Sequence, residues 1–228
     1  MGGQDERFPR GSFLASLASA PRAAMLELGT ARDFEAERVL LRQGERTTHV
    51  HLLVHGCVKV TATTPDGQLA LLAIRVGGDL VGELASIDGQ PRVATVTTAG
   101  RVRTRLVTQA EFHRFLTRNP EVAVALSRSV GMKLRWATRR RIDFGSHEVR
   151  IRLARVLLEL ASGYGVPRGT QVEIGVALTQ PELAALVGAA EPTVHRALAG
   201  LRREGVVSTG YRRIRLLDHD RLARLAEG

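Results

Sequence analysis

The feature that most constrains this chain is a pair of short helical patterns separated by one glycine, within residues 178–204. The apolar residues of each pattern recur at steps of three and four, which places them on one face of an α-helix. They are Leu183, Leu186 and Val187 in the first pattern, and Val194, Leu198 and Leu201 in the second. A chain of this kind folds into two short helices around a tight turn at Gly188.

The first of these helices has a clear start signal. Thr179 is a helix-capping residue, and it is followed by Gln180, Pro181 and Glu182, which suit the first turn of a helix. Two helices joined in this way can present the second helix to the major groove of DNA. The alternative is an ordinary helical hairpin inside a core. The patterns in the rest of the chain distinguish the two interpretations.

Composition limits the choice of class. The chain has 228 residues, which allows one large or two ordinary domains, and its net charge of +10 favours nucleic-acid phosphates. Its apolar runs are too short to cross a membrane, and residues 1–7 lack a signal-peptide pattern. Cys57 is the only cysteine, which excludes an internal disulfide. We therefore expect a cytoplasmic protein without a membrane partner.

The N-terminal half has the pattern of an antiparallel sheet. Short β-rich runs alternate with glycine turns, and Asp66-Gly67 is a good hairpin turn. The runs are residues 39–41, 50–54, 57–62, 69–74, 93–97 and 102–107. This regularity predicts a roll or sandwich. Residues 12–30 are expected to form one or two short helices, broken at Pro21.

After Thr108 the apolar period becomes helical. Residues 110–118 predict a short helix, and residues 120–144 predict a long one with a narrow apolar stripe that Arg141 interrupts. The stripe consists of Ala123, Val130, Leu134, Ala137 and Phe144, with Leu126 adjacent to it. Such a stripe is typical of a seam between two paired helices, although a helix packed on its own domain is the alternative. Gly145-Ser146 is the expected hinge.

The C-terminal part completes a DNA-binding pattern. Residues 149–163 predict an amphipathic helix before the helix pair, and residues 205–217 predict a two-stranded wing after it. The expected fold is therefore α+β: an N-terminal antiparallel β-roll (jelly roll) over residues 1–119, a dimerisation helix over 120–144, and a winged helix-turn-helix over 145–228. We find no catalytic Ser/His/Asp, Cys/His or paired-carboxylate pattern.

This order of modules resembles the Crp/Fnr family of bacterial transcription regulators over residues 12–217. Residues 78–96 resemble that family's phosphate-binding cassette, with Gly82-Glu83-Leu84-Ala85 followed by Pro91-Arg92. The resemblance implies that Glu83 binds a ribose 2′-hydroxyl and Arg92 pairs with a cyclic phosphate. It also implies that Gly82, Leu84 and Ala85 offer backbone N–H groups.

Two positions depart from the members that bind cyclic AMP. Val93 stands where they offer Ser or Thr to the phosphate, and Ala137-Thr138 stands where they carry a Thr-Ser pair on the long helix. Thr138 can still reach a purine edge, with Trp136 nearby. Each lost hydrogen bond costs about 1–3 kcal/mol, so the affinity or the preferred base should differ.

The reading helix also departs from the catabolite-activator type. The matching positions hold Glu191, Pro192 and Arg196. Arg196 can read guanine, and Glu191 can accept from cytosine, although Glu191 and Pro192 also suit a first helical turn. We therefore expect an operator different from the familiar one. The other candidate DNA contacts are Thr179, Gln180, Thr193, His195, Arg202, Arg212 and Arg213.

The expected function is a homodimeric DNA-binding regulator on a two-fold symmetric operator, with RNA polymerase as a further partner. A cyclic nucleotide, cAMP or cGMP, is the favoured effector, and we expect no tightly bound cofactor. One alternative keeps the fold but has a degenerate pocket in which Glu83 and Arg92 only pair with each other. That protein would bind DNA without an effector.

A second alternative is a cupin-like metalloenzyme. His49, His51 and His55 have equal parity on a strand pattern, so their side chains would share one face and could hold a metal. The Glu and later His that such a site requires are missing at sensible spacing, because His113 falls in a helix. We therefore expect no metal site.

Overall fold

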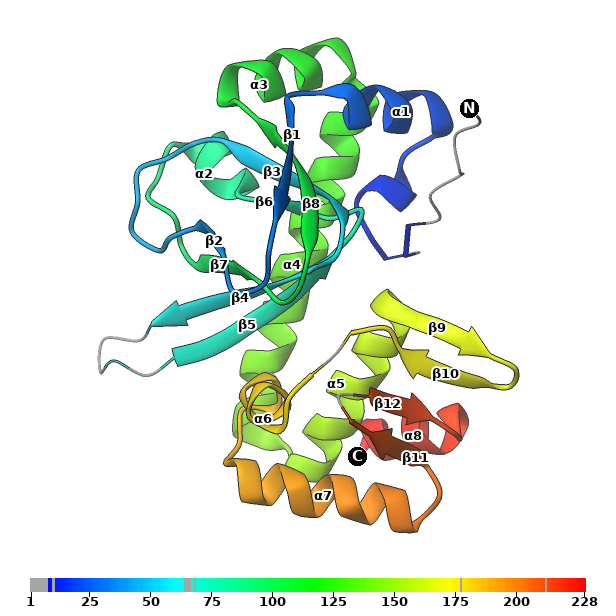
Figure 1. Cartoon of the computed structure of the whole chain (residues 1–228). Coiled ribbons are helices and arrows are strands. Elements are labelled where there is room, and N and C mark those ends of the chain that lie inside the picture. Colours follow the sequence, from blue (N-terminus) through cyan, green and yellow to red (C-terminus); the bar gives the residue numbers. More distant parts are fainter. Residues whose placement is uncertain (1–7, 10, 64–66, 68, 177, 212) are drawn as a thin grey trace. The chain divides into compact units, whose positions relative to one another are not determined.

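The computed structural model describes residues 8–9, 11–63, 67, 69–176, 178–211 and 213–228 (Figure 1). The chain divides into two compact units, residues 1–131 and 132–228, and each is treated by itself. The first unit is a β-roll with helices at its ends, and the second is a helical domain with one antiparallel sheet. The predicted α+β class is confirmed.

The first unit contains two four-stranded antiparallel sheets, in the orders β1-β8-β3-β6 and β2-β7-β4-β5. The six predicted runs are strands: β2 (Val39–Leu41), β3 (Val50–His55), β4 (Cys57–Thr63), β5 (Leu69–Val76), β7 (Thr95–Thr98) and β8 (Val102–Val107). The sequence patterns did not predict β1 (Thr30–Phe34) or β6 (Leu80–Val81). β4 and β5 form the expected hairpin, while Asp66 of its predicted turn lies outside the described residues.

Short helices close the first unit. They are η1 (Leu14–Ser16), α1 (Ser19–Glu27), α2 (Glu83–Asp88) and α3 (Gln109–Arg118). The expected break at Pro21 is wrong, because α1 runs through it. Pro21 lies in the first turn, where a backbone N–H has no partner within the helix in any case.

The long helix α4 (Pro120–Ser146) begins in the first unit and ends in the second. Near its start, Val122 and Leu126 are buried in the core that also holds Phe112. Leu126 therefore packs inside its own unit. Further along, Leu134 and Ile142 are 66% and 60% exposed, and the side chain of Phe144 is not described. The exposed apolar positions of α4 are the part available to a second helix.

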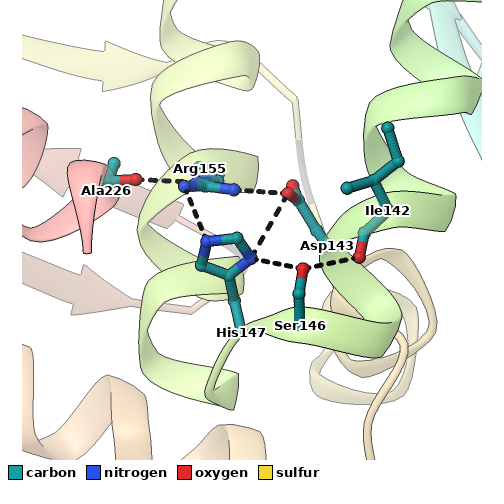
Figure 2. Close-up of polar contacts among 6 residues, drawn as sticks. All are labelled: Ile142, Asp143, Ser146, His147, Arg155 and Ala226. Atoms are coloured by element: carbon teal, nitrogen blue, oxygen red, sulfur yellow. Dashed lines mark hydrogen bonds and ion pairs between the residues drawn. The ribbon is translucent and has the colours of Figure 1, made fainter.

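The junction after α4 differs from the predicted hinge at Gly145-Ser146, because α4 continues through Ser146 and α5 (Val149–Tyr164) begins three residues later. Figure 2 shows the polar network at this junction. Arg155 of α5 binds Asp143 of α4 and donates to His147 Nε2 (3.2 Å) and the Ala226 carbonyl (2.7 Å). These contacts join the end of α4 to the first half of α5 and to α8.

The hydrogen bonds of this network also assign the proton on His147. A guanidinium can only donate, so His147 Nε2 accepts from Arg155. Ser146 Oγ donates to the Ile142 carbonyl (2.8 Å) and lies 2.9 Å from His147 Nδ1. The ring therefore carries its proton on Nδ1 and donates it to Ser146, while Nδ1 also lies 3.8 Å from Asp143 Oδ1, the remaining contact drawn in Figure 2.

The second unit contains the predicted helix pair and wing. They are α6 (Gln180–Val187), α7 (Glu191–Arg203), β11 (Val207–Gly210) and β12 (Arg213–Leu216). The sheet order is β11-β12-β10-β9, so two further strands that were not predicted, β9 (Gly165–Arg168) and β10 (Gln171–Ile174), extend the wing. A last helix, α8 (His219–Glu227), packs on α5. Among the described residues, no helix is long and apolar enough to span a membrane.

A cluster of Trp136, Arg140 and Glu159 lies between α4 and α5. Burial raises the pKa of Glu159 to about 7, against the opposing effects of the Trp136 hydrogen bond and of Arg140 and Arg139, while Asp143 raises it further. The folded state therefore holds a proton on Glu159 at a pH where the unfolded chain has lost it. Its contribution to stability is full below a pH of about 4.5 and is lost as the pH rises through about 7.

We expect the Glu159→Gln variant to gain stability relative to the wild type as the pH rises from about 5 to about 8. The expected difference is on the order of 1–2 kcal/mol, because partial exposure weakens the effect. Urea unfolding at the two pH values, followed by the fluorescence of the single tryptophan, measures it. A wild-type-to-variant difference that stays constant between these pH values would contradict the prediction.

Candidate effector pocket and DNA-reading surface

The loop and helix after β6 position the predicted acidic contact. Leu80 and Val81 of β6 are buried, and Gly82 then takes a left-handed conformation (φ 87°) as the N-cap of α2. A Cβ at Gly82 would lie 2.7 Å from Arg92 Nη1 and 2.9 Å from Leu41 Cδ1. Glycine at this position therefore lets α2 begin directly beneath Arg92, and it places Glu83 in the interior with 6% exposure.

Arg92 lies in the loop between α2 and β7 and is only 4% exposed. Its guanidinium donates through Nε to Thr47 Oγ1 (3.0 Å), through Nη1 to the Gly82 carbonyl (2.7 Å) and through Nη2 to the His49 carbonyl. Among the described residues, these bonds use three of the five N–H donors of a guanidinium. The orientation of Arg92 is therefore fixed by the protein, with donors remaining for an anion.

The charges around Arg92 are unusual for a buried site. Burial lowers the pKa of Arg92, and the carboxylates of Glu83 and Glu45 oppose that effect. Burial and the Arg92 charge also lower the pKa of His49. His51 is 3% exposed, and burial, His49 and Arg92 lower its pKa to about 4. The guanidinium of Arg92 is thus the positive group of this interior, with neutral imidazoles on one side and the carboxylates of Glu83 and Glu45 near enough to stabilise its charge.

The structure brings Gly82, Glu83 and Arg92 together, and Leu84 and Ala85 follow Glu83 in α2. Leu84 and Val93 are 39% and 62% exposed, so they are at the surface beside this interior. Ala85 is buried in α2. Thr138 is exposed on α4 in the second unit. The contact set beyond Gly82, Glu83 and Arg92 therefore stays a prediction.

The predicted alignment of His49, His51 and His55 on one face is wrong for His55 alone, because the ring centres of His49 and His51 lie 5.3 Å apart. The register of β3 against β8 shifts between Leu53 and His55, so the alternation of side chains is broken there. His51 Nδ1 lies 3.0 Å from Thr104 Oγ1 inside the sheet, whereas His55 is exposed and lines a surface hollow with Asp33 and Glu35. No group of three or more possible metal ligands gathers among the described residues.

We expect Gly82→Ala to destabilise the first unit, because the new Cβ would displace Arg92 or Leu41 and because alanine is strained at positive φ. The expected loss of unfolding free energy is about 2 kcal/mol. Denaturant unfolding followed by circular dichroism measures it. Gly89→Ala is the matched control, since Gly89 also has positive φ but its Cβ would meet nothing within 4 Å. Equal losses in the two variants would show that contact with Arg92 is unimportant.

In the second unit, the predicted start of α6 is confirmed. Thr179 is the N-cap, its Oγ1 accepts from the Glu182 N–H, and Glu182 accepts in return from the Thr179 N–H. Gly188 closes α6 in a left-handed conformation (φ 67°), so the chain turns and α7 begins at Glu191. This local chemistry fixes where α6 begins and ends, with a capping box at its start and a left-handed glycine at its end.

α7 has one buried face and one exposed face. Val194, Leu198 and Leu201 are 0–2% exposed and fix the helix on the domain. On the other side, Glu191, His195 and Arg196 are exposed, and Thr193 is half-buried. The sequence analysis missed Arg203, which is exposed and lies seven residues after Arg196, on the same side of the helix. That spacing was the signal that could have identified it.

The wing adds further candidate contacts. Arg202 of α7 donates to Thr209 Oγ1 of β11 (3.2 Å), so it also links the reading helix to the wing. Arg213 is exposed at the start of β12, and Tyr211 at the tip is 89% exposed. Arg212 lies outside the described residues. The exposed face of α7 and the wing tip therefore present mainly arginine, which suits contact with phosphates and guanine edges.

Known proteins share both parts of this arrangement. A family model of the cyclic nucleotide-binding domain matches residues 31–119, and one of the Crp-like helix-turn-helix domain matches residues 151–225. The chain is 30% identical over 222 residues to a CRP-like cAMP-activated global transcriptional regulator of Mycobacterium tuberculosis, which covers 97% of this chain and 99% of that protein. The chain belongs to the Crp/Fnr family.

Other relatives carry different names. The chain is 28% identical to the anaerobic regulatory protein of Bacillus subtilis, over 85% of this chain and 82% of that protein. It matches the crystal structure of a CRP/FNR-family transcriptional regulator from Thermus thermophilus with a TM-score of 0.69 and 28% identity, over 87% and 99% of the two chains. This Crp/Fnr protein is a DNA-binding transcription regulator with an effector domain, and its family consists of regulators, which are not enzymes.

Proposed function

We propose that this regulator binds a cyclic nucleotide in its β-roll and reads a two-fold symmetric operator as a homodimer. The single observation that carries the effector proposal is the buried Arg92, which three protein acceptors hold above Gly82 with donors remaining. A cyclic phosphate is an anion that these donors fit. Glu83, buried beside it, would accept from the ribose 2′-hydroxyl.

The remaining predicted contacts extend this proposal. The backbone N–H groups of Leu84 and Ala85 would bind phosphate oxygens, and Val93 would border them. Thr138 would reach the base. These assignments follow the family cassette at the matching positions, and α2 places the first two residues next to Glu83. The nucleotide would act as a reversible effector.

On the DNA side, Arg196 and Arg203 would enter the major groove, with Glu191, Thr193 and His195 beside them. Thr179, Gln180, Arg202, Arg212 and Arg213 would contact the backbone of the operator. The exposed apolar residues of α4, such as Leu134 and Ile142, support pairing with a second copy. A dimer would place two α7 helices in grooves about one helical turn apart.

The proposed role is binding rather than catalysis. A regulator of this kind would work beside RNA polymerase on the chromosome, which places it in the bacterial cytoplasm. Activation of transcription by the purified polymerase on a template carrying the selected operator would test that partner. An unchanged transcript level with and without the regulator would argue against it.

Isothermal titration calorimetry with cyclic AMP and cyclic GMP tests the effector proposal. We expect binding by the full-length wild type, and no heat from 5′-AMP, whose phosphate is not cyclic. Loss of selectivity between the cyclic and the open phosphate would contradict the proposed cassette. The same titration gives the base preference, which the exposed Thr138 alone does not fix.

We expect Val93→Thr to raise the affinity for cyclic nucleotide about fivefold, because it restores one hydroxyl donor at the phosphate, worth about 1 kcal/mol. Val93 is 62% exposed, so the fold should tolerate the change. Ile87→Thr, at a 52% exposed position of α2, is the matched control and should leave the affinity unchanged. Calorimetry gives the dissociation constants of the wild type and the two variants. If the constant of Val93→Thr equals that of the wild type, the phosphate does not bind beside residue 93.

A specific observation also favours the second candidate, an effector-independent regulator. Arg92 already has three protein acceptors, and the carboxylate of Glu83 contributes to its charge balance, so the interior is stable without a ligand. Under this alternative, neither cyclic nucleotide binds and the operator affinity is constitutive. Calorimetry separates the two candidates directly.

A further inference from the structure

The C-terminal end of α6 is bound by arginines from two other helices. Carbonyls in the last turn of a helix lack partners within the helix. Here Arg140 of α4 donates to the carbonyls of Ala185 (3.2 Å) and Leu186, and Arg152 of α5 donates to the Gly188 carbonyl (3.1 Å). Figure 1 shows α6 beside the C-terminal part of α4. The turn of the helix-turn-helix is therefore held from outside the helix pair.

Arg140 is itself held firmly. Its guanidinium carbon lies 4.5 Å from the centre of the Trp136 ring, one helical turn earlier on α4. The carboxylate of Glu159 on α5 accepts a hydrogen bond from Trp136 and attracts Arg140. Burial lowers the pKa of Arg140 and Glu159 counteracts it, so the guanidinium keeps its charge in the interior. The Arg140 guanidinium therefore has a single orientation, because it stacks on Trp136, is attracted by Glu159 and donates to two carbonyls.

This arrangement makes a direct link between α4 and the reading helix. Gly188 closes α6 and leads into α7 within three residues, so a shift of the α6 end carries α7 with it. α4 offers the exposed side chains of Leu134 and Ile142 to a second copy. In a dimer, the link would transmit the geometry of the paired α4 helices to the two reading helices.

We propose that Arg140 is a positioning residue that locks the helix-turn-helix to α4, so that the two reading helices of a dimer keep one fixed separation. Trp136 and Glu159 hold Arg140 in place, and we call the three residues the α4 latch. This inference rests on the proposed homodimer. It concerns the distance between the two half-sites of the operator. The base sequence of each half-site is a separate property, which α7 reads.

The test uses the full-length wild type and an operator selected from random duplex DNA. Binding is measured on that operator and on versions with one base pair added or removed between the half-sites. We expect the wild type to lose about tenfold or more in affinity on the altered spacings. Arg140→Gln should reduce this penalty to about threefold or less, and Arg140→Lys, which still donates to carbonyls but cannot stack as a planar fork, should be intermediate.

Two controls separate positioning from charge and from folding. Arg135→Gln removes the same charge from an exposed position of α4 and should keep the wild-type spacing penalty. Glu159→Gln keeps an acceptor for Trp136 but removes the charge that attracts Arg140, and at a pH of about 8, where Glu159 is ionised, it should weaken the penalty even if Arg140→Gln fails to fold. The fluorescence of Trp136, the single tryptophan, should change in Arg140→Gln and stay unchanged in Arg135→Gln.

The outcomes distinguish the latch from the proposed function. If the wild type shows no sequence preference at all, the dimeric operator reading fails and the latch fails with it. If the wild type discriminates between spacings and both Arg140→Gln and Glu159→Gln discriminate equally well, the proposed function stands and the latch is overturned. A reduced spacing penalty in these two variants, with Arg135→Gln like the wild type, supports the latch.

Discussion

Replacing Arg196 with alanine is expected to lower the affinity for the selected operator by about 10- to 100-fold per half-site. Arg196 is exposed on α7, on the side opposite the buried Val194 and Leu198, where a bidentate bond to guanine is worth about 1–3 kcal/mol. The loss should be largest at one base pair, because only that position loses its reader. Fluorescence anisotropy with a set of single-base operator variants measures both the affinity and the preference.

The matched control for this prediction is Arg224→Ala. Arg224 is exposed on α8, so the variant removes the same charge from the same unit without altering α7. We expect it to weaken specific and non-specific DNA binding about equally, if at all, and to leave the base preference intact. If Arg196→Ala weakens all sequences by one common factor, then Arg196 is a phosphate contact rather than a base reader.

Replacing Arg92 with alanine is expected to have two large effects at once. The carbonyls of Gly82 and His49 would lose their donor, and Glu83 would be left buried beside an empty position. Removing one member of a buried charged network typically costs about 3–5 kcal/mol, so the first unit should be strongly destabilised. Cyclic nucleotide binding should fall by at least about 100-fold, because the charged bonds to the phosphate disappear.

Thermal unfolding with and without cyclic nucleotide separates these two effects. A ligand that binds only the folded state raises the midpoint, so the wild type should be stabilised by cyclic nucleotide and Arg92→Ala should not. Arg103→Ala is the control in the same unit, because Arg103 is exposed and pairs with exposed Asp33. It should cost less than about 1 kcal/mol and keep the ligand shift. A normal ligand shift in Arg92→Ala would remove Arg92 from the pocket.

The sequence predicted most accurately what local chemistry decides. The capping pair of Thr179 and Glu182, the turn at Gly188 and the apolar spacing of α7 are all set within a few residues, and the structure confirms them. β1 was missed because Thr30–Phe34 is mostly exposed and has no apolar alternation. It is a strand because it pairs with β8, more than 65 residues away in the chain.

The residues of the candidate effector site also divide into those that a local motif indicates and those that only the fold brings together. Glu83 and Arg92 lie within one short motif that resembles the family's phosphate-binding cassette, which is why the sequence could nominate them. That Arg92 donates to Thr47 and to the His49 carbonyl depends on the path of a loop more than 40 residues earlier, which no local pattern encodes. The latch was missed for the same reason, since Arg140 meets Leu186 and Glu159 only in the folded unit.

The histidines of β3 show that one irregularity in a strand can make a prediction from side-chain alternation wrong. Parity placed His51 and His55 on one face, and a single register shift between Leu53 and His55 separated them. His51 is consequently buried against Thr104, and His55 faces solvent. A metal-site prediction from strand parity holds only while the ladder is regular.

The most direct test of the central claim is the affinity of the full-length wild type for its selected operator, measured with and without saturating cyclic nucleotide. If the nucleotide in the β-roll controls DNA reading, the operator affinity should change by about tenfold or more, while non-specific DNA binding stays the same. Equal operator affinity in the presence of cyclic AMP, of cyclic GMP and of neither would contradict the account.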